Sequence, residues 1–306
     1  MTSCKASGCT FDKSDHILRQ ATAVRERQDR DVTDAYYELI DSADPRGERF
    51  AASEHVVSTW GSTMQNAAPV SALLVRALER CSPRDDSRIS RVVVDLLGPV
   101  PVTDRLWVNA RVERPGTRIE LVAAEMTAPG PDGTPRPVAK ATAWRFQHTD
   151  TDELHFTPAE PLPPVAEGRR RIAEAGSDQT YIQSLDWRWL NDILNSVQAQ
   201  CWARPLVDLV AGESMTPTQQ LFAVADIANG MGTRLDPTEW TFLNTDLAVH
   251  IHRLPEGQWV GVRSENHYGT DGVGISRGTL FDEVGAVAAI QQAQLVRRRP
   301  APDVPG

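Results

Sequence analysis

The sequence has 306 residues, of which 41% are apolar and 24% are charged, a balance typical of a globular protein with one large domain or two smaller ones. Its net charge of −9 argues against binding to nucleic acid or to an anionic membrane surface. No apolar run approaches the ~20 residues that span a bilayer, and Asp12 and Lys13 interrupt any signal peptide. We therefore expect a cytoplasmic protein.

The chain has four cysteines: Cys4, Cys9, Cys81 and Cys201. Their spacing is not that of a disulfide framework, which favours a reducing compartment. Cys4, Cys9 and His16 lack the fourth ligand and the spacing of a zinc site. His250 and His252 share one face of a predicted strand, but no third ligand lies nearby in the sequence. We therefore predict neither a metal nor a cofactor.

Three segments have compositions that are poor for a folded core. A charged stretch lies near the N-terminus, four prolines fall within residues 157–167, and three prolines follow the arginines near the C-terminus. Proline removes a backbone donor and fixes φ, so it interrupts helices and central strands. The predicted organisation is an N-terminal extension (1–34), an N-terminal domain (35–156), a linker (157–178), a C-terminal domain (179–299) and a tail (300–306).

The N-terminal half contains one helix pattern followed by four strand patterns. A helix is predicted over Ala67–Arg80, because its apolar residues fall on one face and Pro69 lies in the first turn. An earlier run, Arg49–Trp60, supplies a further strand candidate. Alternating or β-branched apolar runs predict the four strands, which cover Arg88–Leu97, Arg105–Val112, Arg118–Met126 and Val138–Phe146.

The C-terminal half repeats this order. Thr216 can cap a helix with Pro217 at its first position, the apolar pattern continues to about Ala228, and Gly230 is expected to end the helix. Two earlier runs, Asp186–Trp189 and Ala199–Ala203, are strand candidates. The four strands that follow the helix are predicted over Thr241–His252, Trp259–Glu265, Gly274–Phe281 and Val287–Arg297.

The two halves are therefore related by an offset of about 150 residues, with Pro69 corresponding to Pro217. This spacing indicates duplication of a small α+β unit. In each unit an apolar helix must be buried, and an antiparallel sheet that curls around the helix can bury it.

Five short runs carry a family resemblance: Leu96–Pro101, Val112–Gly116, Leu221–Gly230, Asn244–Arg253 and Ala289–Arg297. In order and spacing they resemble the double hot-dog thioesterase-like family of actinobacteria. More distantly, they resemble the bacterial acyl-CoA thioesterase II type and its peroxisomal relatives. The resemblance covers roughly residues 45–299. It implies two fused hot-dog folds, each a long helix wrapped by an antiparallel sheet.

The resemblance also implies three catalytic residues. In the family an Asp on the second-half helix, a Thr or Ser at a strand start, and a Gln on the last strand hold a water. Asp226, Asn244 and Gln292 occupy the matching positions. Asn244 departs from the family's hydroxyl; an amide still donates and accepts hydrogen bonds, but with a different geometry.

Asp226 also stands out from the residues alone. It follows the apolar run Phe222–Ala225 on a helix with little polar surface, where burial of a carboxylate raises its pKa toward the range of a general base. A carboxylate bonded to the backbone, or placed at a wet helix end, is the structural alternative. Gln292 and Gln294 share one strand face; this face is either solvated, or it contains a buried Gln292 that orients a water.

A second departure precedes the first helix. Family members commonly carry Gln-His-Gly-Gly-Pro, whereas this chain has Gln65-Asn66-Ala67-Ala68-Pro69. The resemblance implies a substrate-binding or oxyanion role for Asn66, Ala67 and Ala68, since amides at a helix N-terminus can polarise a thioester carbonyl. Alanines keep these amides but crowd the approach. The alternative is an ordinary helix-capping turn.

The resulting expectation is an acyl-CoA thioesterase of fatty acid metabolism, in which Asp226 activates a water that attacks an acyl-CoA or acyl-carrier thioester. The sequence has no Gly-x-Ser-x-Gly run and no cysteine in a nucleophile motif, which disfavours a covalent intermediate. The alternative, favoured by Asn244 and the Ala67–Ala68 pair, is a non-hydrolytic acyl-binding or biosynthetic accessory protein on the same scaffold. Acyl chain length, and monomer against homo-oligomer, stay open.

Overall fold

The computed structural model describes residues 34–170, 180–192 and 195–299. The predicted extension up to residue 33, part of the predicted linker and the predicted tail lie outside these ranges. In the described part of the chain, no helix is both long enough and apolar enough to span a membrane.

The N-terminal half follows the predicted order of one helix and then four strands. Its elements are β1 (Ala35–Asp41), β2 (Glu48–Ala52), β3 (Val57–Ser58), β4 (Gly61–Gln65), α2 (Ala67–Arg80), β5 (Ser87–Leu96), β6 (Leu106–Arg114), β7 (Ile119–Pro129) and β8 (Pro135–Gln147). Short 3₁₀ turns lie at Glu54–Val56, Asp152–Leu154 and Val165–Glu167.

The C-terminal half adds three helical segments and nine strands among the described residues. They are β9 (Arg169–Arg170), α3 (Thr180–Gln183), β10 (Leu185–Trp189), β11 (Ala199–Pro205), β12 (Asp208–Val210), α4 (Pro217–Ala225), α5 (Ala228–Met231), β13 (Trp240–Asn244), β14 (Asp246–Ile251), β15 (Val260–Tyr268), β16 (Val273–Asp282) and β17 (Gly285–Arg298).

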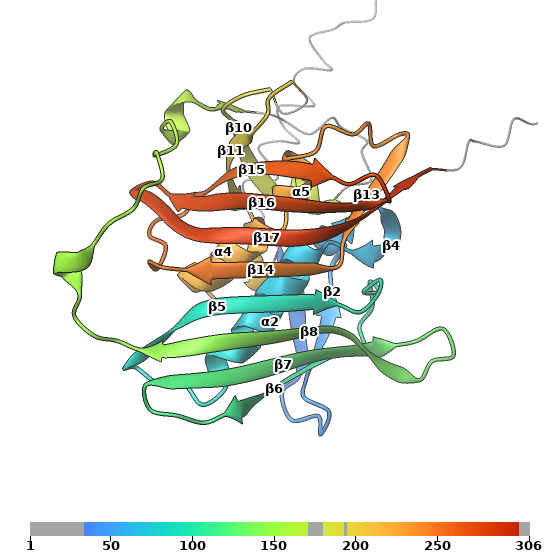
Figure 1. The fold of residues 1–306 in the computed structure, drawn as a ribbon. Helices are drawn as coiled ribbons and strands as arrows, with labels where there is room; N and C mark the ends of the chain where they lie inside the picture. Colours follow the sequence, from blue (N-terminus) through green and yellow to red (C-terminus); the bar gives the residue numbers. More distant parts are fainter. Residues whose placement is uncertain (1–33, 171–179, 193–194, 300–306) are drawn as a thin grey trace, which may run out of the picture. The chain divides into compact units, whose positions relative to one another are not determined.

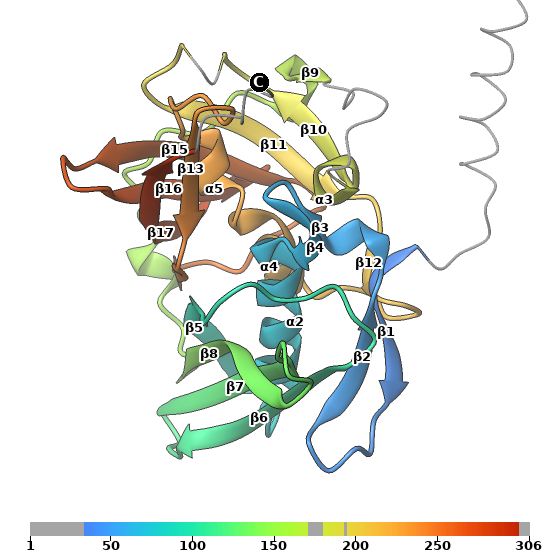
Figure 2. The same cartoon turned by 90° about the vertical axis from the view of Figure 1, so that its right-hand side faces the viewer.

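One curved sheet joins the two halves. Among the described strands its order is β12-β1-β2-β6-β7-β8-β5-β14-β17-β16-β15-β11-β10-β9, with β13 also paired to β17. The halves meet where β5 runs antiparallel to β14, with Val94 opposite Leu247, and where β1 runs parallel to β12. The sheet curls around α2 and α4, which pack against each other in the interior (Figures 1 and 2). The predicted domain boundaries stay predictions.

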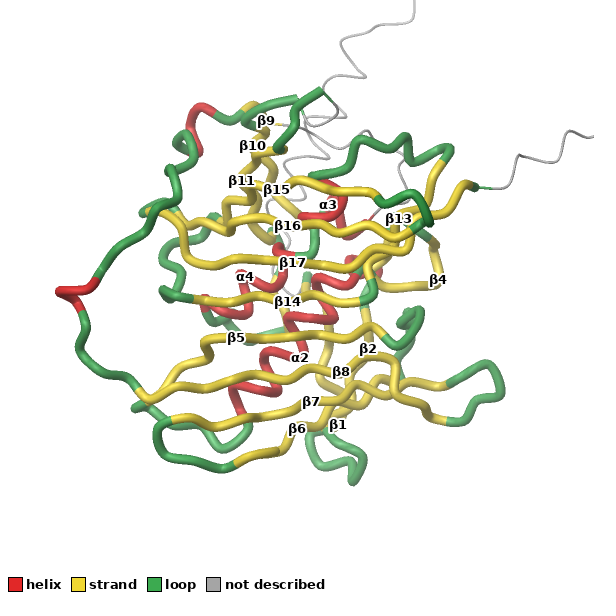
Figure 3. The backbone as a smooth tube through the Cα atoms, in the orientation of Figure 1, coloured by secondary structure: helices red, strands yellow, loops and turns green. Residues whose placement is uncertain are grey.

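Helix α2 confirms the predicted bounds Ala67–Arg80. Asn66 caps it by accepting a hydrogen bond from the backbone N–H of Ala68 (2.9 Å), and Pro69 lies in its first turn, where no intrahelical donor is lost. The helix is buried from Ala68 to Leu78, because strands cover one side and α4 the other (Figure 3).

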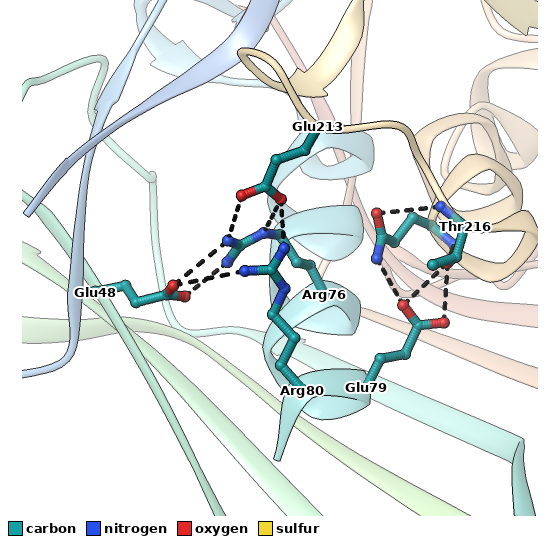
Figure 4. Close-up of polar contacts among 7 residues, drawn as sticks. Glu48, Arg76, Glu79, Arg80, Glu213 and Thr216 are labelled. Carbon is teal, nitrogen blue, oxygen red and sulfur yellow. Dashed lines mark hydrogen bonds and ion pairs between the residues drawn. The ribbon is translucent and has the colours of Figure 1, made fainter. Parts of the chain in front are cut away.

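Arg76 is the charged residue within the buried part of α2, and its side chain is 1% exposed. Its guanidinium donates to Glu48 Oε2 (2.6 Å) on β2 and to Glu213 Oε2 (2.7 Å) after β12 (Figure 4). Arg80, at the end of the same helix, also donates to Glu213 (2.8 Å) but is half exposed. These ion pairs connect the two halves of the chain.

A hydrogen-bond network around Glu79 fixes α2 against the start of α4. Glu79 accepts hydrogen bonds from the Thr216 hydroxyl (2.9 Å) and the Gln219 amide (2.6 Å), as Figure 4 shows for Thr216. Burial raises the pKa of Glu79, and these donors partly oppose the rise. Thr216 also caps α4 as predicted, in a reciprocal capping box with Gln219.

Two predictions about the C-terminal half are wrong. Gly230 does not end the helix: α4 stops at Ala225, and Gly230 lies inside α5, where the N–H of Gly232 still bonds to Ala228 (2.9 Å). The predicted strand Thr241–His252 is two strands, β13 and β14. Both pair with β17, but the register shifts by one residue between them, so a bulge separates them at Thr245.

Candidate active site

A cavity of about 830 Å³ lies between the start of α2, the junction of α4 with α5, and strands β10 and β13. Its walls are rich in aromatic side chains, and Trp60 meets Phe242 edge to face with ring centroids 4.9 Å apart. Of the described residues that line it, only Asp226 and Arg299 are charged. The cavity can therefore hold an apolar group beside a single buried carboxylate.

The break between α4 and α5 positions Asp226. Asp226 and Ile227 have ψ of −11° and −13°, values typical of 3₁₀ rather than α geometry. The N–H of Ile227 accordingly bonds to the carbonyl of Val224, three residues back (3.0 Å). This tight turn places Asp226 directly after the last residue of α4. There the residue is 4% exposed and lines the cavity.

The structure brings the three predicted catalytic residues together. Asn244 Nδ2 donates to Asp226 Oδ1 (2.7 Å), and Gln292 Nε2 donates to the same oxygen (2.8 Å). No described residue donates to Asp226 Oδ2. Burial raises the pKa of Asp226 to about 7, and the two amide donors limit the rise. A carboxyl of this kind changes protonation state near neutral pH, which suits a general base.

The bulge at Thr245 sets the direction of Asn244. Asn244 lies opposite Gln294 on β17, and after the extra residue Ala248 lies opposite Gln291. Asn244 therefore faces inward, toward Asp226. Its amide is fully engaged within the protein, because Nδ2 also donates to the carbonyl of Asp246 (3.3 Å) and Oδ1 accepts from Asn229 Nδ2 (3.1 Å).

Asn229 is a site residue that the sequence analysis missed. It is 7% exposed, lines the cavity and orients the amide of Asn244. The available signal was its place three residues after Asp226, since side chains at this spacing share one helix face.

Gln292 differs from Asn244 in having an unused acceptor. It is 2% exposed, and its Oε1 accepts no hydrogen bond from any described residue. Of the two interpretations left open above, this burial favours the amide that orients a water over a solvated face. Gln292 does not itself line the cavity, but its Oε1 and Asp226 Oδ2 both lack a described donor, and one water could donate to both.

The predicted oxyanion residues are placed unequally. Asn66 and Ala67 line the same cavity as Asp226, whereas Ala68 is fully buried and does not. The N–H of Ala68 bonds to Asn66 Oδ1, while the N–H of Ala67 has no acceptor within the described residues. Gln65 is structural: it accepts from Tyr37 Oη (2.7 Å) and donates to the carbonyl of Pro101 (2.7 Å).

No histidine or cysteine is among the described residues that line the cavity. His250 ends up exposed on β14, and His252 is exposed just beyond that strand. Across the residues the structure describes, no three His, Cys, Asp or Glu side chains group as metal ligands. Cys81 and Cys201 are free thiols, and Cys4, Cys9 and His16 lie outside the described residues.

Buried Asp226 should make stability fall with rising pH. Its folded pKa of about 7 exceeds the value of about 3.9 for an unfolded chain. The stability from the neutral form is therefore fully present below pH ~4 and lost as pH rises through ~7. We expect Asp226→Asn, which does not titrate, to melt close to wild type near pH 4 and at higher temperature near pH 8.5. Equal differences at both pH values, measured by calorimetry, would argue against a buried ionisable Asp226.

Comparisons with known proteins decide the family. Models of the acyl-CoA thioesterase N-terminal domain and C-terminal domain match residues 56–146 and 152–296. The chain belongs to the acyl-CoA thioesterase family. No curated protein gives a significant match.

Solved structures of similar fold support the two-domain hot-dog assignment. A Thermobifida fusca protein of assigned thioesterase II type has 18% identity and a TM-score of 0.66, covering 86% of this chain and 95% of its own. A hot-dog protein from Alicyclobacillus acidocaldarius has 16% identity and a TM-score of 0.65, covering 84% and 95%. An acyl-CoA thioesterase II from Mycobacterium marinum has 14% identity and a TM-score of 0.55, covering 71% and 83%. At these identities the likeness establishes the double hot-dog fold alone.

Proposed function

We propose that this thioesterase-family protein hydrolyses acyl thioesters, delivered by CoA or by an acyl carrier, through a water activated by Asp226. The observation that carries the proposal is the placement of one buried carboxylate in an apolar cavity. Both predicted amide partners donate to its Oδ1, no described residue donates to its Oδ2, and Asp226 lines the cavity.

In the proposed reaction a water donates one hydrogen bond to Asp226 Oδ2 and one to Gln292 Oε1. Its oxygen lone pairs then point away from these acceptors, and one of them is directed toward a thioester carbonyl in the cavity. As the water oxygen attacks the carbonyl carbon, Asp226 Oδ2 takes the proton. When the C–S bond breaks, the proton on Asp226 can pass to the departing thiolate, which returns the carboxylate to its starting state.

The attack places negative charge on the former carbonyl oxygen. The N–H of Ala67, in the first turn of α2, is available as a donor, and the positive end of the helix dipole favours negative charge there. Asn66 Nδ2 is the second donor that we propose, because Asn66 Oδ1 is engaged with Ala68 while Nδ2 has no acceptor among the described residues. Ala68 is no longer proposed as a donor.

Thiol release from a panel of acyl-CoA thioesters tests the proposal. We expect release of free CoA with saturation kinetics for acyl groups that fit the cavity, because the walls beside Asp226 are largely apolar. The same panel delivered on an acyl carrier protein separates the two forms of substrate. No release above the buffer rate for any member, with binding of none, would contradict the proposal.

A non-hydrolytic acyl-binding protein is the second candidate. The Asn244 amide and the Ala68 N–H favour this candidate, because both form hydrogen bonds within the protein. In these positions they are not available to bind a substrate or a water. Calorimetric binding of an acyl-CoA without thiol release in the same panel would support this candidate over the first.

A further inference from the structure

The inner face of the last strand changes from apolar to polar as it approaches the candidate site. Along β17, Ala288 and Ile290 pack into the core, and the next two inward positions are Gln292 and Gln294, which are 2% and 3% exposed. Both ends of the Gln294 amide lack a hydrogen-bond partner among the described residues. Burying an amide without hydrogen-bond partners costs folding free energy, so we expect a bound molecule to contact Gln294.

Ser276 extends this polar surface onto β16. It lies directly opposite Gln292, is fully buried, and its Oγ has no partner among the described residues. Side chains opposite one another in an antiparallel pair share a face, with Cβ atoms about 5 Å apart. Ser276, Gln292 and Gln294 therefore surround one small region next to Asp226, and none of the three lines the cavity. Gln292 Oε1 has two lone pairs, so it can accept a hydrogen bond here as well as from the water proposed at Asp226 Oδ2.

Hydrogen-bond counting indicates what this region contains. Gln292 Oε1 and Gln294 Oε1 are acceptors, while the Ser276 hydroxyl can donate one proton and Gln294 Nε2 can donate two. Next to Ser276 on β15, Asn266 Oδ1 is a further buried acceptor without a described partner. None of these donors and acceptors is paired with another in the structure, so they do not satisfy one another directly. A water supplies two more donors, and buried waters typically make about three hydrogen bonds to such groups.

We infer that Ser276, Gln292 and Gln294 bind a structural water next to Asp226, and that Ser276 and Gln294 act as positioning residues for Gln292. This inference rests on the proposed function for its catalytic meaning. A donor on the Oε1 side of Gln292 fixes which end of the amide faces Asp226. With Oε1 so engaged, Nε2 points to Asp226 Oδ1, as observed at 2.8 Å, and stabilises the ionised carboxylate.

The other titratable groups around Asp226 do not supply this stabilisation. Tyr181 on α3 donates its hydroxyl to the carbonyl of Ala223, and burial raises the pKa of Tyr181 and of Cys201 on β11 far above their usual values, so both stay neutral. Asp246 accepts from the N–H of Ala293 (2.7 Å). Within the described structure the donors to Asp226 are the amides of Asn244 and Gln292.

The first test is a high-resolution crystal structure of the full chain. We expect a water within hydrogen-bond distance of Gln292 Oε1 and of Ser276 Oγ or the Gln294 amide. Direct hydrogen bonds among these three side chains, with no water between them, would overturn the inference.

The second test follows the Asp226 carboxyl by carbon-13 NMR as a function of pH, with Asp226→Asn to assign its signal. In Ser276→Ala and in Gln294→Met the pH of half-titration should rise by about one pH unit, because a freely rotating Gln292 donates less to the carboxylate. Ser71→Ala is the matched control: Ser71 is equally buried and its Oγ is also without a described partner, but it lies on α2.

A titration of Asp226 that is unchanged in both site variants would refute the positioning role. Two variants are needed because either one alone could fail to fold. Neither readout requires turnover. Failure of acyl-CoA hydrolysis would therefore reject the proposed function, while the water site would still be decided by the crystal structure and the titration.

Discussion

Replacing Asp226 with Asn is expected to lower kcat for acyl-CoA hydrolysis by about 10²–10⁴-fold, the usual contribution of a general base, with little change in KM. The Asn carbonyl can still accept from Asn244 and Gln292, which both donate to Oδ1 in the native protein. The fold and the apolar cavity are therefore retained. The amide nitrogen that replaces Oδ2 cannot take a proton from water, so the chemical step is slowed.

Glu79→Gln provides the matched control for this experiment. Glu79 is a partly buried carboxylate with a raised pKa and hydrogen bonds from an amide and a hydroxyl, but it does not line the cavity. Its turnover should stay within about twofold of wild type, a difference of less than about 0.5 kcal/mol in activation free energy. Similar losses of kcat in both variants would point to a general effect of burying an amide, and would remove Asp226 from the chemistry.

Arg76→Met is expected to destabilise the folded protein by about 3–5 kcal/mol, the range for removing one partner of a buried ion pair. Arg76 is 1% exposed and neutralises Glu48 and Glu213, which are both 27% exposed. After the substitution these carboxylates face each other across an apolar side chain without a buried counter-charge. Because they belong to different halves of the chain, the contact between the halves should weaken first.

Arg80→Met separates this effect from the loss of a surface charge. Arg80 contacts the same two carboxylates, with Glu213 at 2.8 Å, but its side chain is 52% exposed. Solvent screening limits such a pair to about 0–1 kcal/mol. Denaturant unfolding should therefore distinguish the two variants clearly, and added salt should reduce only the Arg80 effect. Equally small losses in both variants would show that the Arg76 cluster does not stabilise the fold.

The first helix could be predicted residue by residue because its signals are local. The Asn66 cap, Pro69 in the first turn and a continuous apolar stripe all act within Ala67–Arg80. Four strands after it were also predicted to within a few residues, because their apolar alternation matches the one-sided burial seen in the sheet. Strands β1, β4 and β12 were not predicted. β1 and β12 pair with each other across the two halves of the chain, a contact that no local pattern indicates, whereas β4 is a short strand that pairs with the neighbouring β3.

Neither the helix break at Asp226 nor the strand bulge at Thr245 was predicted from the sequence. The apolar pattern runs unbroken from α4 into α5, so the sequence predicts one helix that ends at Gly230. The single 3₁₀ bond from Ile227 to Val224 interrupts it instead. The apolar alternation changes phase between Phe242 on β13 and Leu247 on β14, but the run was predicted as one strand. The pairing of both strands with β17 places the extra residue between them. These two irregularities are what place Asp226 and Asn244 in contact.

The grouping of Asp226, Asn244 and Gln292 came from the family resemblance, since the residues alone left a structural role open for Asp226 and Gln292. Ser276 and the engagement of Ala68 in the helix cap depend on three-dimensional contacts that no spacing in the sequence encodes, and for Asn229 the spacing of three residues from Asp226 was the available signal.

The central claim, direct attack by a water held at Asp226, is tested most directly by a single turnover in H₂¹⁸O with enzyme in excess over acyl-CoA. Mass spectrometry then locates the label in the acid product and in the peptide that contains Asp226. Direct attack predicts one ¹⁸O atom in the released carboxylic acid and none in that peptide. An unlabelled acid together with ¹⁸O in Asp226 would show that the carboxylate itself attacks the thioester, and would contradict the account.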